Sequence, residues 1–515
     1  MQLKKLAAAC AIAFAAAPAF AIGAFDAPDV TVFLSGASAP DNFIDGIAAG
    51  MFTGTKAAGD WHKYVSGTHS RAYFGTMKSA APVPASLQGK KVLFIKRSSG
   101  GSVFGVDPVA RAEGLRILQI VANTAVAPAV NGCTQTAVGA DWACLLGGND
   151  PGVATPTGQE RTPDFGVSDV GPAMFKSPLN VEFGKGQLSP SEAAKLTVKG
   201  VNTLAMGFAV TNAIPDSTEI SRAQYGAMLA GNIQDWTQID PTLAPAGGNQ
   251  VVVCRRTPGS GTQASYNWYF NNFPCTTQSL AGTGSTPPAR MSDSAGYNDG
   301  DASGYPDTGS GTLTDPYIID ASAGYTVIEN QGSGDVRKCL AAAANGTAYT
   351  FLDEQGKSFK VDFSAGAHGA IGVLSVDSLS DRTDASDGTR GARDPSITGA
   401  FSFRAMDGKG AYWDSNDTSS VVPAQSATVT GILPTKQNLI DAKYDFAAEL
   451  TMQYLSTLTG LKKDFADFFI AEAGKPGNNT VAWTAALPPT YAPPTANVAK
   501  ATRFGNQCAP LQQLF

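Results

Sequence analysis

Apolar runs alternate with amphipathic segments along much of the chain, and Gly- and Ser-rich turns stand at many of the junctions. Apolar and polar residues alternate over 29–35, which predicts a strand, and the apolar spacing of 43–49 predicts a helix after it. The apolar runs 91–96 and 204–210 predict two further strands. Strands that alternate with helices are typical of an α/β protein, which is the fold class we expect.

Three further helices are predicted farther along the chain. Ser221 is placed to cap a helix that runs to Ile233. Residues 263–273 put four aromatic side chains on one helical face, where core packing is the simplest role for them. Near the end of the chain, the apolar positions of 442–473 predict one long helix.

The most informative stretch is 251–262, which reads VVVCRRTPGSGT. An apolar run ends in two arginines, and a loop of small residues leads into the aromatic helix. Such a turn at a helix start presents backbone N–H groups and the positive end of the helix dipole. Arg256 adds a charged fork, and Ser260 and Thr262 add hydroxyl groups. This set of donors predicts a site for a small oxyanion.

The first 21 residues have the features of a secretory signal. Two lysines precede an apolar segment over 6–17, and residues 19–21 read Ala-Phe-Ala, a small-residue cleavage site. We expect cleavage after Ala21 and an exported protein, either periplasmic or secreted. No later stretch of the sequence approaches the ~18 apolar residues that indicate a transmembrane helix.

The cysteine count supports export. One of the seven cysteines, Cys10, lies in the signal segment, so six remain after the expected cleavage. An even number of cysteines in an exported chain indicates disulfides. Many connectivities are open, and pairing the nearest neighbours in sequence predicts Cys133–Cys144, Cys254–Cys275 and, by elimination, Cys339–Cys508.

Length and charge narrow the function classes. A chain of 515 residues is long enough for two or more domains, and a net charge of -6 argues against nucleic acid and anionic membranes as partners. The three histidines lack the zinc-protease spacing, and no G-x-S-x-G nucleophile motif occurs. We therefore expect neither an enzyme nor a cofactor or metal site.

Residues 276–325 have a different composition, with abundant Gly, Ser, Thr, Asp and Pro and few aliphatic residues. This composition predicts an extended surface insertion. Calcium binding by its aspartates is an alternative, although their spacing does not match an EF-hand loop; these aspartates are Asp293, Asp299, Asp301 and Asp307.

Several short motifs follow one another in a definite order: 35–40 (SGASAP), 98–101 (SSGG), 165–169 (FGVSD), 206–212 (MGFAVTN), 228–236 (MLAGNIQDW), 256–262 (RTPGSGT) and 368–373 (HGAIGV). Each motif is weak alone. The ordered set, which covers about Val30 to Asp377, resembles the phosphate-binding protein of the periplasmic phosphate importer, a type II periplasmic binding protein.

The resemblance implies a two-lobed α/β fold with hinge crossover strands and a ligand cleft between the lobes. Lobe one would comprise residues 22–203 plus 377–515, and lobe two would comprise residues 204–376. It also implies inorganic phosphate as the ligand, an inner-membrane ABC permease as the partner, and a monomer. Transferred position by position, the ligand-binding residues would be Ser38, Ser98 or Ser99, Asp169, Arg256, Ser260, Gly261 and Thr262.

Asp169 is chemically unusual in an anion site, since a carboxylate repels a fully ionised anion. It can accept a hydrogen bond from hydrogen phosphate, which carries a proton near pH 7, whereas sulfate carries none. Asp169 would therefore select phosphate against sulfate. One departure from the family's pattern concerns Pro258, which replaces an Asp that pairs with the arginine, so affinity and ligand identity depend on how Arg256 is held.

Other functional interpretations of the same residues remain possible alternatives. A secreted phosphatase or esterase on this scaffold is one alternative, and an extracellular phosphate-scavenging or adhesion protein is another. Residues 259–264 also fit the G-x-G-x-x-A dinucleotide fingerprint, but Pro258 precedes them and no clear acidic residue follows at the required distance.

Overall fold

The computed structural model describes most of the chain after the expected signal, and residues 1–21 lie outside the described residues. The described ranges are 22–67, 69–122, 132–146, 160–182, 184–275, 288–297, 304–353, 355–379, 399–413, 424–480, 483–488 and 496–515.

The chain forms two compact units, each assembled from separate stretches of sequence. The first unit comprises Met1–Val32, Ala48–Ile95 and Arg116–Glu160. The second comprises Phe33–Ile47, Lys96–Leu115 and Arg161–Phe515. The two-lobed division expected from the sequence, 22–203 plus 377–515 and 204–376, stays a prediction.

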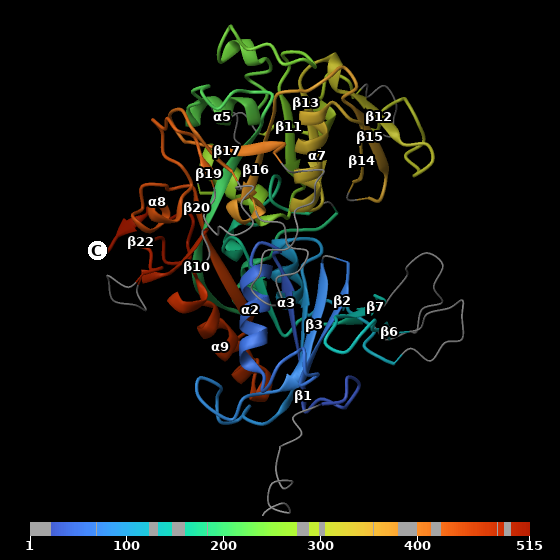
Figure 1. Cartoon of the computed structure of the whole chain (residues 1–515), viewed down its shortest axis with the longest axis vertical. Helices are drawn as coiled ribbons and strands as arrows, with labels where there is room; N and C mark the ends of the chain where they lie inside the picture. The colour runs from blue at the N-terminus through green and yellow to red at the C-terminus, as the bar shows by residue number, and fades with distance from the viewer. Residues whose placement is uncertain are drawn as a thin grey trace, which may run out of the picture. The chain divides into compact units, whose positions relative to one another are not determined.

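The first unit contains short paired strands (Figure 1). Strand β2 (Trp61–Ser66) forms an antiparallel hairpin with β3 (Ser70–Thr76). On its other side β2 pairs in parallel with β7 (Trp142–Cys144), which pairs with β6 (Cys133–Thr134) in antiparallel register. Cys133 thereby stands opposite Cys144.

The second unit is organised around the long strand β10 (Leu196–Thr211), which pairs in antiparallel fashion with β20 (Ala447–Leu455) and β16 (Ala370–Ser375). Parallel pairing extends the sheet from β16 to β11 (Val252–Arg256) and from there to β13 (Thr326–Asn330). This mixed sheet, with helices packed against it, confirms the predicted α/β class.

On the other side of β20, the sheet continues to strands whose ends carry the motifs 35–40 and 165–169. Strand β9 (Phe165–Ser168) pairs antiparallel with β20 and parallel with the end of β1 (Val30–Gly36). Two shorter strands, β17 (Phe401–Arg404) and β21 (Thr484–Ala486), also pair with β10.

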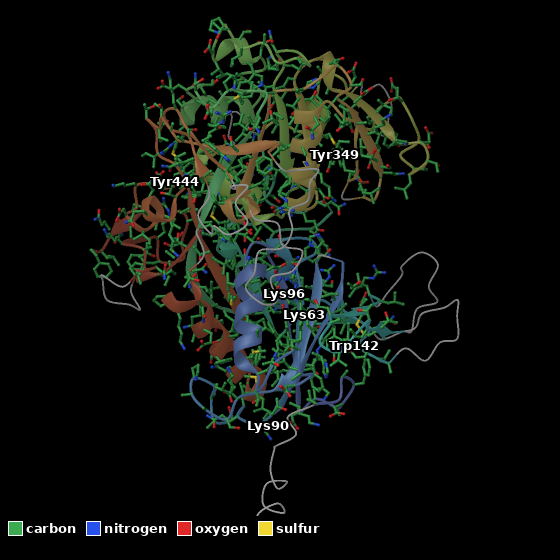
Figure 2. The ribbon with its side chains drawn as sticks, viewed as in Figure 1. Lys63, Lys90, Lys96, Trp142, Tyr349 and Tyr444 are labelled. Atoms are coloured by element: carbon green, nitrogen blue, oxygen red, sulfur yellow. A yellow bond between two sulfur atoms is a disulfide. The ribbon has the colours of Figure 1, made fainter. Side chains whose placement is uncertain are left out.

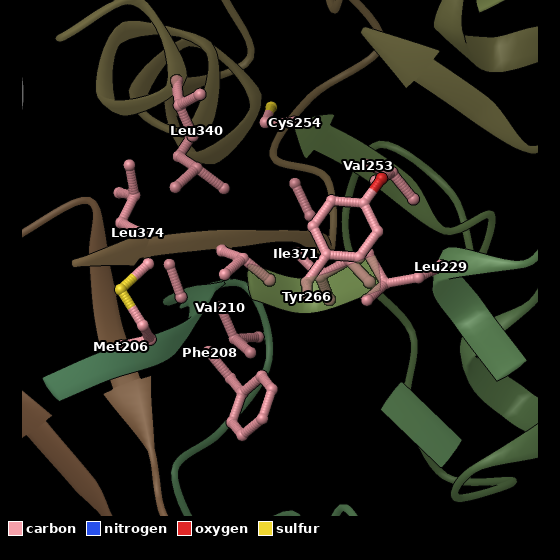
Figure 3. Packing of buried hydrophobic residues seen from close by; sticks show 14 of the residues in the cluster. Met206, Phe208, Val210, Leu229, Val253, Cys254, Tyr266, Leu340, Ile371 and Leu374 are labelled. Atoms are coloured by element: carbon pink, nitrogen blue, oxygen red, sulfur yellow. The ribbon is translucent and has the colours of Figure 1, made fainter. Parts of the chain in front are cut away.

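The core of the second unit packs on both faces of β10 (Figure 3). Met206, Phe208 and Val210 share one face of the strand, and the residues between them are buried as well. Leu340 of α7 (Ser333–Asn345) contributes to the same cluster, and α7 packs against β16 and β11. Burial on both faces explains why 204–210 is an unbroken apolar run.

Ser221 caps α5 (Arg222–Leu229) through the backbone N–H of Gln224, which confirms the predicted helix start. In the described part of the chain, no helix is long and apolar enough to cross a bilayer. The other elements are α2 (Asp41–Met51), α3 (Asp107–Arg111), α4 (Pro190–Ala193), α6 (Gly261–Asn271), α8 (Lys436–Ile440), α9 (Gly460–Ala473), β4 (Lys91–Arg97), β5 (Leu115–Arg116), β8 (Glu160–Arg161), β12 (Tyr317–Asp320), β14 (Tyr349–Leu352), β15 (Ser358–Asp362), β18 (Ala411–Trp413), β19 (Ala424–Gln425), β22 (Ala501–Thr502) and β23 (Gln512–Gln513).

The prediction of one helix over 442–473 is wrong. The structure has strand β20 over Ala447–Leu455 and helix α9 over Gly460–Ala473. Leu450 and Tyr454 are four residues apart, a spacing that places side chains on one face of a helix and equally on one face of a strand. Pairing with β10 decides in favour of the strand.

The surface-insertion prediction for 276–325 holds for only part of its described residues. Met291, Tyr297 and Tyr325 are buried, and the Tyr325 hydroxyl donates a hydrogen bond to the Met228 carbonyl oxygen at 2.7 Å. Strand β12, within the same range, pairs with β15. The segment therefore supplies part of the core, while Asp299 and Asp301 lie outside the described residues.

The disulfides agree with the predicted pairing in one case and contradict it in two. Cys133–Cys144 is confirmed. Cys254–Cys275 and Cys339–Cys508 are wrong, since the structure pairs Cys254 with Cys339 and Cys275 with Cys508. Cys254 is on β11, against which α7 packs with Cys339, so contact across the fold decides the pairing rather than distance along the chain.

The pairing can be tested with Cys508→Ser, which should free the thiol of Cys275 and leave Cys339 bonded to Cys254. We expect alkylation in urea without reductant, followed by peptide mass spectrometry, to modify Cys275. Loss of a link that spans 233 residues should also lower the free energy of unfolding by about 2–4 kcal/mol. Alkylation of Cys339 instead would contradict the assignment.

Candidate functional site

The candidate site lies in the second unit, where the loops after β1, β4, β9 and β11 meet. The Ala37 N–H donates to the Val167 carbonyl oxygen at 2.9 Å, which joins the loop after β1 to β9. The Val103 N–H donates to the Gly259 carbonyl oxygen at 3.0 Å, which joins the loop after β4 to the loop after β11. Loops at the carboxyl ends of strands are the usual ligand-binding positions in α/β proteins.

Asp169, directly after β9, is buried beside Ser102 and Gly261. The Ser102 hydroxyl donates to Asp169 Oδ2 at 3.1 Å, and the Asp169 N–H donates to the same hydroxyl oxygen at 3.2 Å. A Cβ atom at Gly261 would lie 2.3 Å from Ser102 Oγ and 2.8 Å from Asp169 Cβ, so only glycine fits there. Asp169 Oδ1 is buried and has no hydrogen-bond partner among the described residues.

The loop over 256–262 ends at the start of α6. Ser260 is the N-cap residue, and its hydroxyl oxygen accepts a hydrogen bond from the Gln263 N–H at 3.4 Å. The N–H groups of Gly261 and Thr262 belong to the first turn, where no intrahelical acceptor exists. The first turn of α6 therefore directs donors and partial positive charge toward the region beside Asp169.

Arg256 is buried at the end of β11, with 4% of its surface exposed. Its guanidinium group donates to the carbonyl oxygens of Asn330 at 3.3 Å and Gln331 at 2.6 Å, and to the Ser333 hydroxyl at 3.0 Å. These three acceptors fix the orientation of the guanidinium group. A Cβ at Gly101 would lie 3.2 Å from Arg256 Nη2, so the guanidinium group borders the loop after β4.

Arg255, the neighbouring residue, faces the other way and has a structural role. It forms an ion pair with Glu329 and donates to the hydroxyl of Tyr266 at 3.2 Å and to the carbonyl oxygen of Ala289. Because successive strand residues point to opposite faces, only Arg256 points toward the loop cluster.

A buried ion pair joins the loop after β1 to the loop after β4. Lys96 Nζ lies 3.5 Å from Asp41 Oδ1, and both side chains are almost completely buried. The Ser98 hydroxyl donates to Asp41 Oδ2 at 2.8 Å, and the Asp41 N–H donates to the Ser38 carbonyl oxygen at 3.0 Å. Ser38 and Ser98, which are far apart in sequence, are thereby brought into one cluster.

The electrostatic balance raises the pKa of Asp169. Burial is the main cause and raises this pKa to about 6, whereas the hydrogen bond from Ser102 and the charges of Arg256 and Lys96 lower it. The negative charge of Asp41 raises it. Asp169 is thus a carboxylate that is mostly ionised above about pH 6 and surrounded by hydrogen-bond donors.

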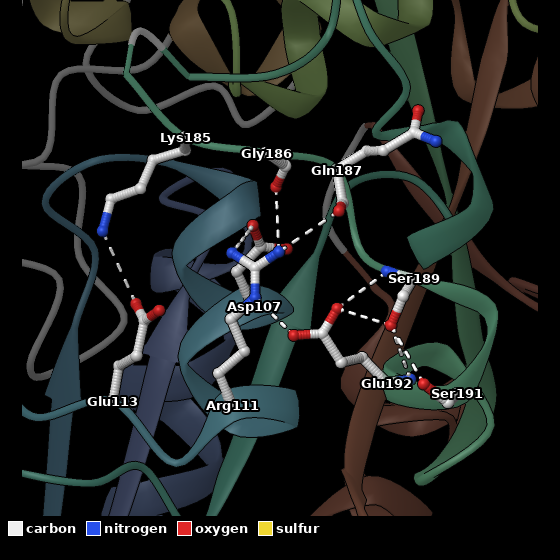
Figure 4. Close-up of polar contacts among 9 residues, drawn as sticks. All are labelled: Asp107, Arg111, Glu113, Lys185, Gly186, Gln187, Ser189, Ser191 and Glu192. Atoms are coloured by element: carbon white, nitrogen blue, oxygen red, sulfur yellow. Dashed lines mark hydrogen bonds and ion pairs between the residues drawn. The ribbon is translucent and has the colours of Figure 1, made fainter.

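A polar network braces helix α3, which follows the loop that carries Ser102 (Figure 4). Arg111 Nε pairs with Glu192 at 2.9 Å, Nη1 lies 3.3 Å from Asp107 Oδ2, and Nη2 donates to the carbonyl oxygens of Gly186 and Gln187. Burial raises the pKa of Asp107 to about 6, against the lowering effect of Arg111. This network anchors α3 to the segment 186–192.

The structure therefore places most of the residues singled out from the sequence in one region, although their contacts with a ligand stay predictions. Ser99 is only half-buried, and its carbonyl oxygen accepts a hydrogen bond from Arg97. Sequence reasoning missed Ser102 and Lys96. Ser102 directly follows the recognised 98–101 turn, and Lys96 is the charged residue at the end of an apolar run, which are the signals that could have identified them.

Among the described residues, no group of three or more His, Cys, Asp or Glu side chains is arranged to hold a metal ion. The described loop cluster combines backbone N–H groups, hydroxyls and the Arg256 guanidinium group with the Asp169 carboxylate, a set of groups suited to anion recognition.

Comparisons with known proteins give structural likenesses. No protein-family model matches the chain, and no curated protein matches it. The chain is similar to a high-affinity periplasmic phosphate-binding protein with bound phosphate, at 12% identity over 90% of this chain and 91% of that one, with a TM-score of 0.36. It is also similar to an ABC-type phosphate transport receptor from Vibrio cholerae (15% identity, 61% and 79% of the two chains, TM-score 0.26). A phosphate-binding protein from Stenotrophomonas maltophilia matches at 12% identity over 83% and 79%, with a TM-score of 0.30. At these identities and TM-scores, the likenesses do not place the chain in a family.

The close approach at Gly261 can be tested with Gly261→Ala. The added methyl group would displace Ser102 or Asp169, and we expect the free energy of unfolding to fall by about 1–3 kcal/mol in urea titrations. Gly46→Ala in α2 is the matched control, because a Cβ there meets nothing within 4 Å, and helix propensity should make that change neutral or stabilising. Equal effects of the two substitutions would contradict the packing described.

Proposed function

We propose that this protein binds inorganic phosphate, as hydrogen phosphate, in the loop cluster of the second unit. The observation that carries the proposal is the buried Oδ1 atom of Asp169, an acceptor with no partner among the described residues. The Asp169 side chain lies beside Gly261, at the donor-rich start of α6. A protonated tetrahedral anion satisfies both kinds of group, since its oxygens accept from the donors and its hydroxyl donates to Asp169.

The proposed donors are the N–H groups of Gly261 and Thr262, the hydroxyl groups of Ser260 and Thr262, and Arg256. The guanidinium group of Arg256 is held by the carbonyl oxygens of Asn330 and Gln331 and by the Ser333 hydroxyl, and it borders the loop after β4. The local positive field offsets the chain's net charge of -6, which would otherwise oppose anion binding.

The loops after β1 and β4 contribute the remaining contacts. Ser38 and its backbone N–H are proposed ligand contacts. The Ser98 hydroxyl proton is directed to Asp41, so Ser99 is the better hydroxyl donor of the second loop. Ser102 directs its proton to Asp169 Oδ2, which leaves Oδ1 as the carboxylate oxygen for the ligand.

The biological role that we propose is that of an exported solute-binding protein which delivers phosphate to an inner-membrane ABC permease. The signal-like segment at 1–21 supports export, and the ordered motifs between Val30 and Asp377 support the solute-binding role. A hinged cleft between the lobes 22–203 plus 377–515 and 204–376 is part of this proposal. No covalent chemistry is required of any residue.

Asp169 should discriminate phosphate from sulfate. We expect calorimetry near pH 7.5 to show phosphate binding at micromolar Kd or tighter, with sulfate weaker by roughly 10- to 100-fold, because sulfate leaves Oδ1 facing another acceptor. Asp169→Asn should remove most of this difference, since an amide can donate to either anion. Asp240→Asn is the control, because the Asp240 carboxylate caps its own turn through Thr242. The absence of binding heat with either anion would sink the proposal.

The raised pKa of Asp169 predicts two pH dependences of opposite sign. Because burial raises this pKa from 3.8 to about 6, the native ligand-free protein holds the proton more tightly than the unfolded chain does. The contribution of Asp169 to the free energy of unfolding is therefore complete below about pH 4 and is lost as the pH rises through about 6. It amounts to at most about 3 kcal/mol. Phosphate affinity should instead fall as the pH falls through about 6, because only the ionised carboxylate accepts the ligand's proton.

Urea unfolding and calorimetry over pH 4–8, each expressed as the difference between wild type and Asp169→Asn, measure the two effects. The difference removes the titration of other groups, such as Asp107, and that of phosphate itself. Stability and affinity differences that change with pH in the same direction would contradict the role assigned to Asp169.

A further inference from the structure

Lys96, labelled in Figure 2, is fully buried, and its side chain contacts the loops after β1 and β4. Its ammonium group donates to the carbonyl oxygens of Gly36 at 3.1 Å, Ala37 at 3.0 Å and Arg97 at 3.2 Å. Asp41 Oδ1 lies 3.5 Å away. An ammonium group has three protons, so the three carbonyl oxygens use its whole donor capacity. Lys96 is therefore engaged with the protein itself rather than directed to a ligand.

The carbonyl groups that Lys96 binds determine where the adjoining N–H groups point. In a planar trans peptide, the C=O and N–H groups lie on opposite sides. The Gly36 carbonyl points to Lys96, and the N–H of the same peptide, that of Ala37, points away to Val167. By the same geometry, the Ala37 carbonyl directs the Ser38 N–H away from Lys96, and the Arg97 carbonyl directs the Ser98 N–H away from it.

We propose that Lys96 is a positioning residue for the anion, a buried clamp that orients the Ser38 and Ser98 N–H groups of the two loops toward a common ligand. The ion pair with Asp41 completes the clamp, because Asp41 also holds the Ser98 hydroxyl. This inference rests on the proposed function, because it assigns the clamp a role at the same phosphate site.

The variants must avoid a buried Asp41 carboxylate that has lost its counter-charge. Lys96→Met alone would leave the Asp41 carboxylate buried without its counter-charge, which can unfold the protein. The test therefore compares Asp41→Asn, in which the Lys96 ammonium group keeps its three carbonyl acceptors, with the double variant Lys96→Met/Asp41→Asn. The two variants differ only at Lys96. Replacement of both charges of a buried pair by neutral groups is commonly tolerated.

Calorimetry with inorganic phosphate should show the Kd of the double variant at least about tenfold higher than that of Asp41→Asn, because two N–H groups lose their orientation. Hydrogen exchange measured by mass spectrometry, without ligand, should show faster exchange of peptides covering 33–43 by about tenfold, with peptides from α9 unchanged. The control is Lys500→Met/Asp441→Asn, which removes an ion pair of 2.5 Å outside the loops and should leave both readouts unchanged.

The outcomes separate the clamp from the proposed function. A purely structural role for Lys96 would lower the midpoint of unfolding and leave the Kd of the folded protein and the 33–43 exchange unchanged, and this result would overturn the inference. If the wild-type protein bound no phosphate, the proposed function would fail, and the exchange of 33–43 would alone decide whether Lys96 holds the loops.

Discussion

The burial of charge among four loops is the constraint on which the site depends. Asp41, Lys96, Asp169 and Arg256 all have less than a tenth of their surface exposed. A buried charge costs several kcal/mol unless hydrogen bonds or an opposite charge offset it, so each of these groups requires particular neighbours. Lys96 and Asp41 form an ion pair, and Arg256 lies among oxygen acceptors. Asp169 is only partly satisfied, because one carboxylate oxygen is hydrogen-bonded and the other is not.

This incomplete satisfaction connects stability with function. The field of Arg256 and Lys96 and the Ser102 hydroxyl hold the carboxylate in the ionised form, whereas burial opposes ionisation. The ligand-free protein therefore keeps a destabilising group at the site, and a protonated anion would supply the missing hydrogen bond. Functional sites commonly retain such unsatisfied polar groups, because full satisfaction within the protein would leave nothing for a ligand to complete.

The rest of the second unit holds the loops in place. The C-terminal segment contacts both sides of the site: the Gly171 N–H donates to Gln507 Oε1 at 2.9 Å, close to Asp169, and Arg503 lies over the ring of Trp268 on α6 at 4.6 Å. The disulfide between Cys275 and Cys508 fixes the same segment just beyond the end of α6. Residues that are distant in sequence thus restrain Asp169 and the helix that follows the 256–262 loop.

Local pattern was sufficient for the α/β class, for the buried strand at 204–210 and for the helix that begins at Gly261, because periodicity, capping residues and small-residue turns act over a few neighbouring residues. The ordered motifs also singled out Asp169 and Arg256. Tertiary structure alone decided that 447–455 is a strand, that Cys254 pairs with Cys339, and that Ser102 and Lys96 belong to the site. These features depend on partners far away in the sequence, and a spacing or a single charged residue does not specify which distant group it will meet when the chain packs.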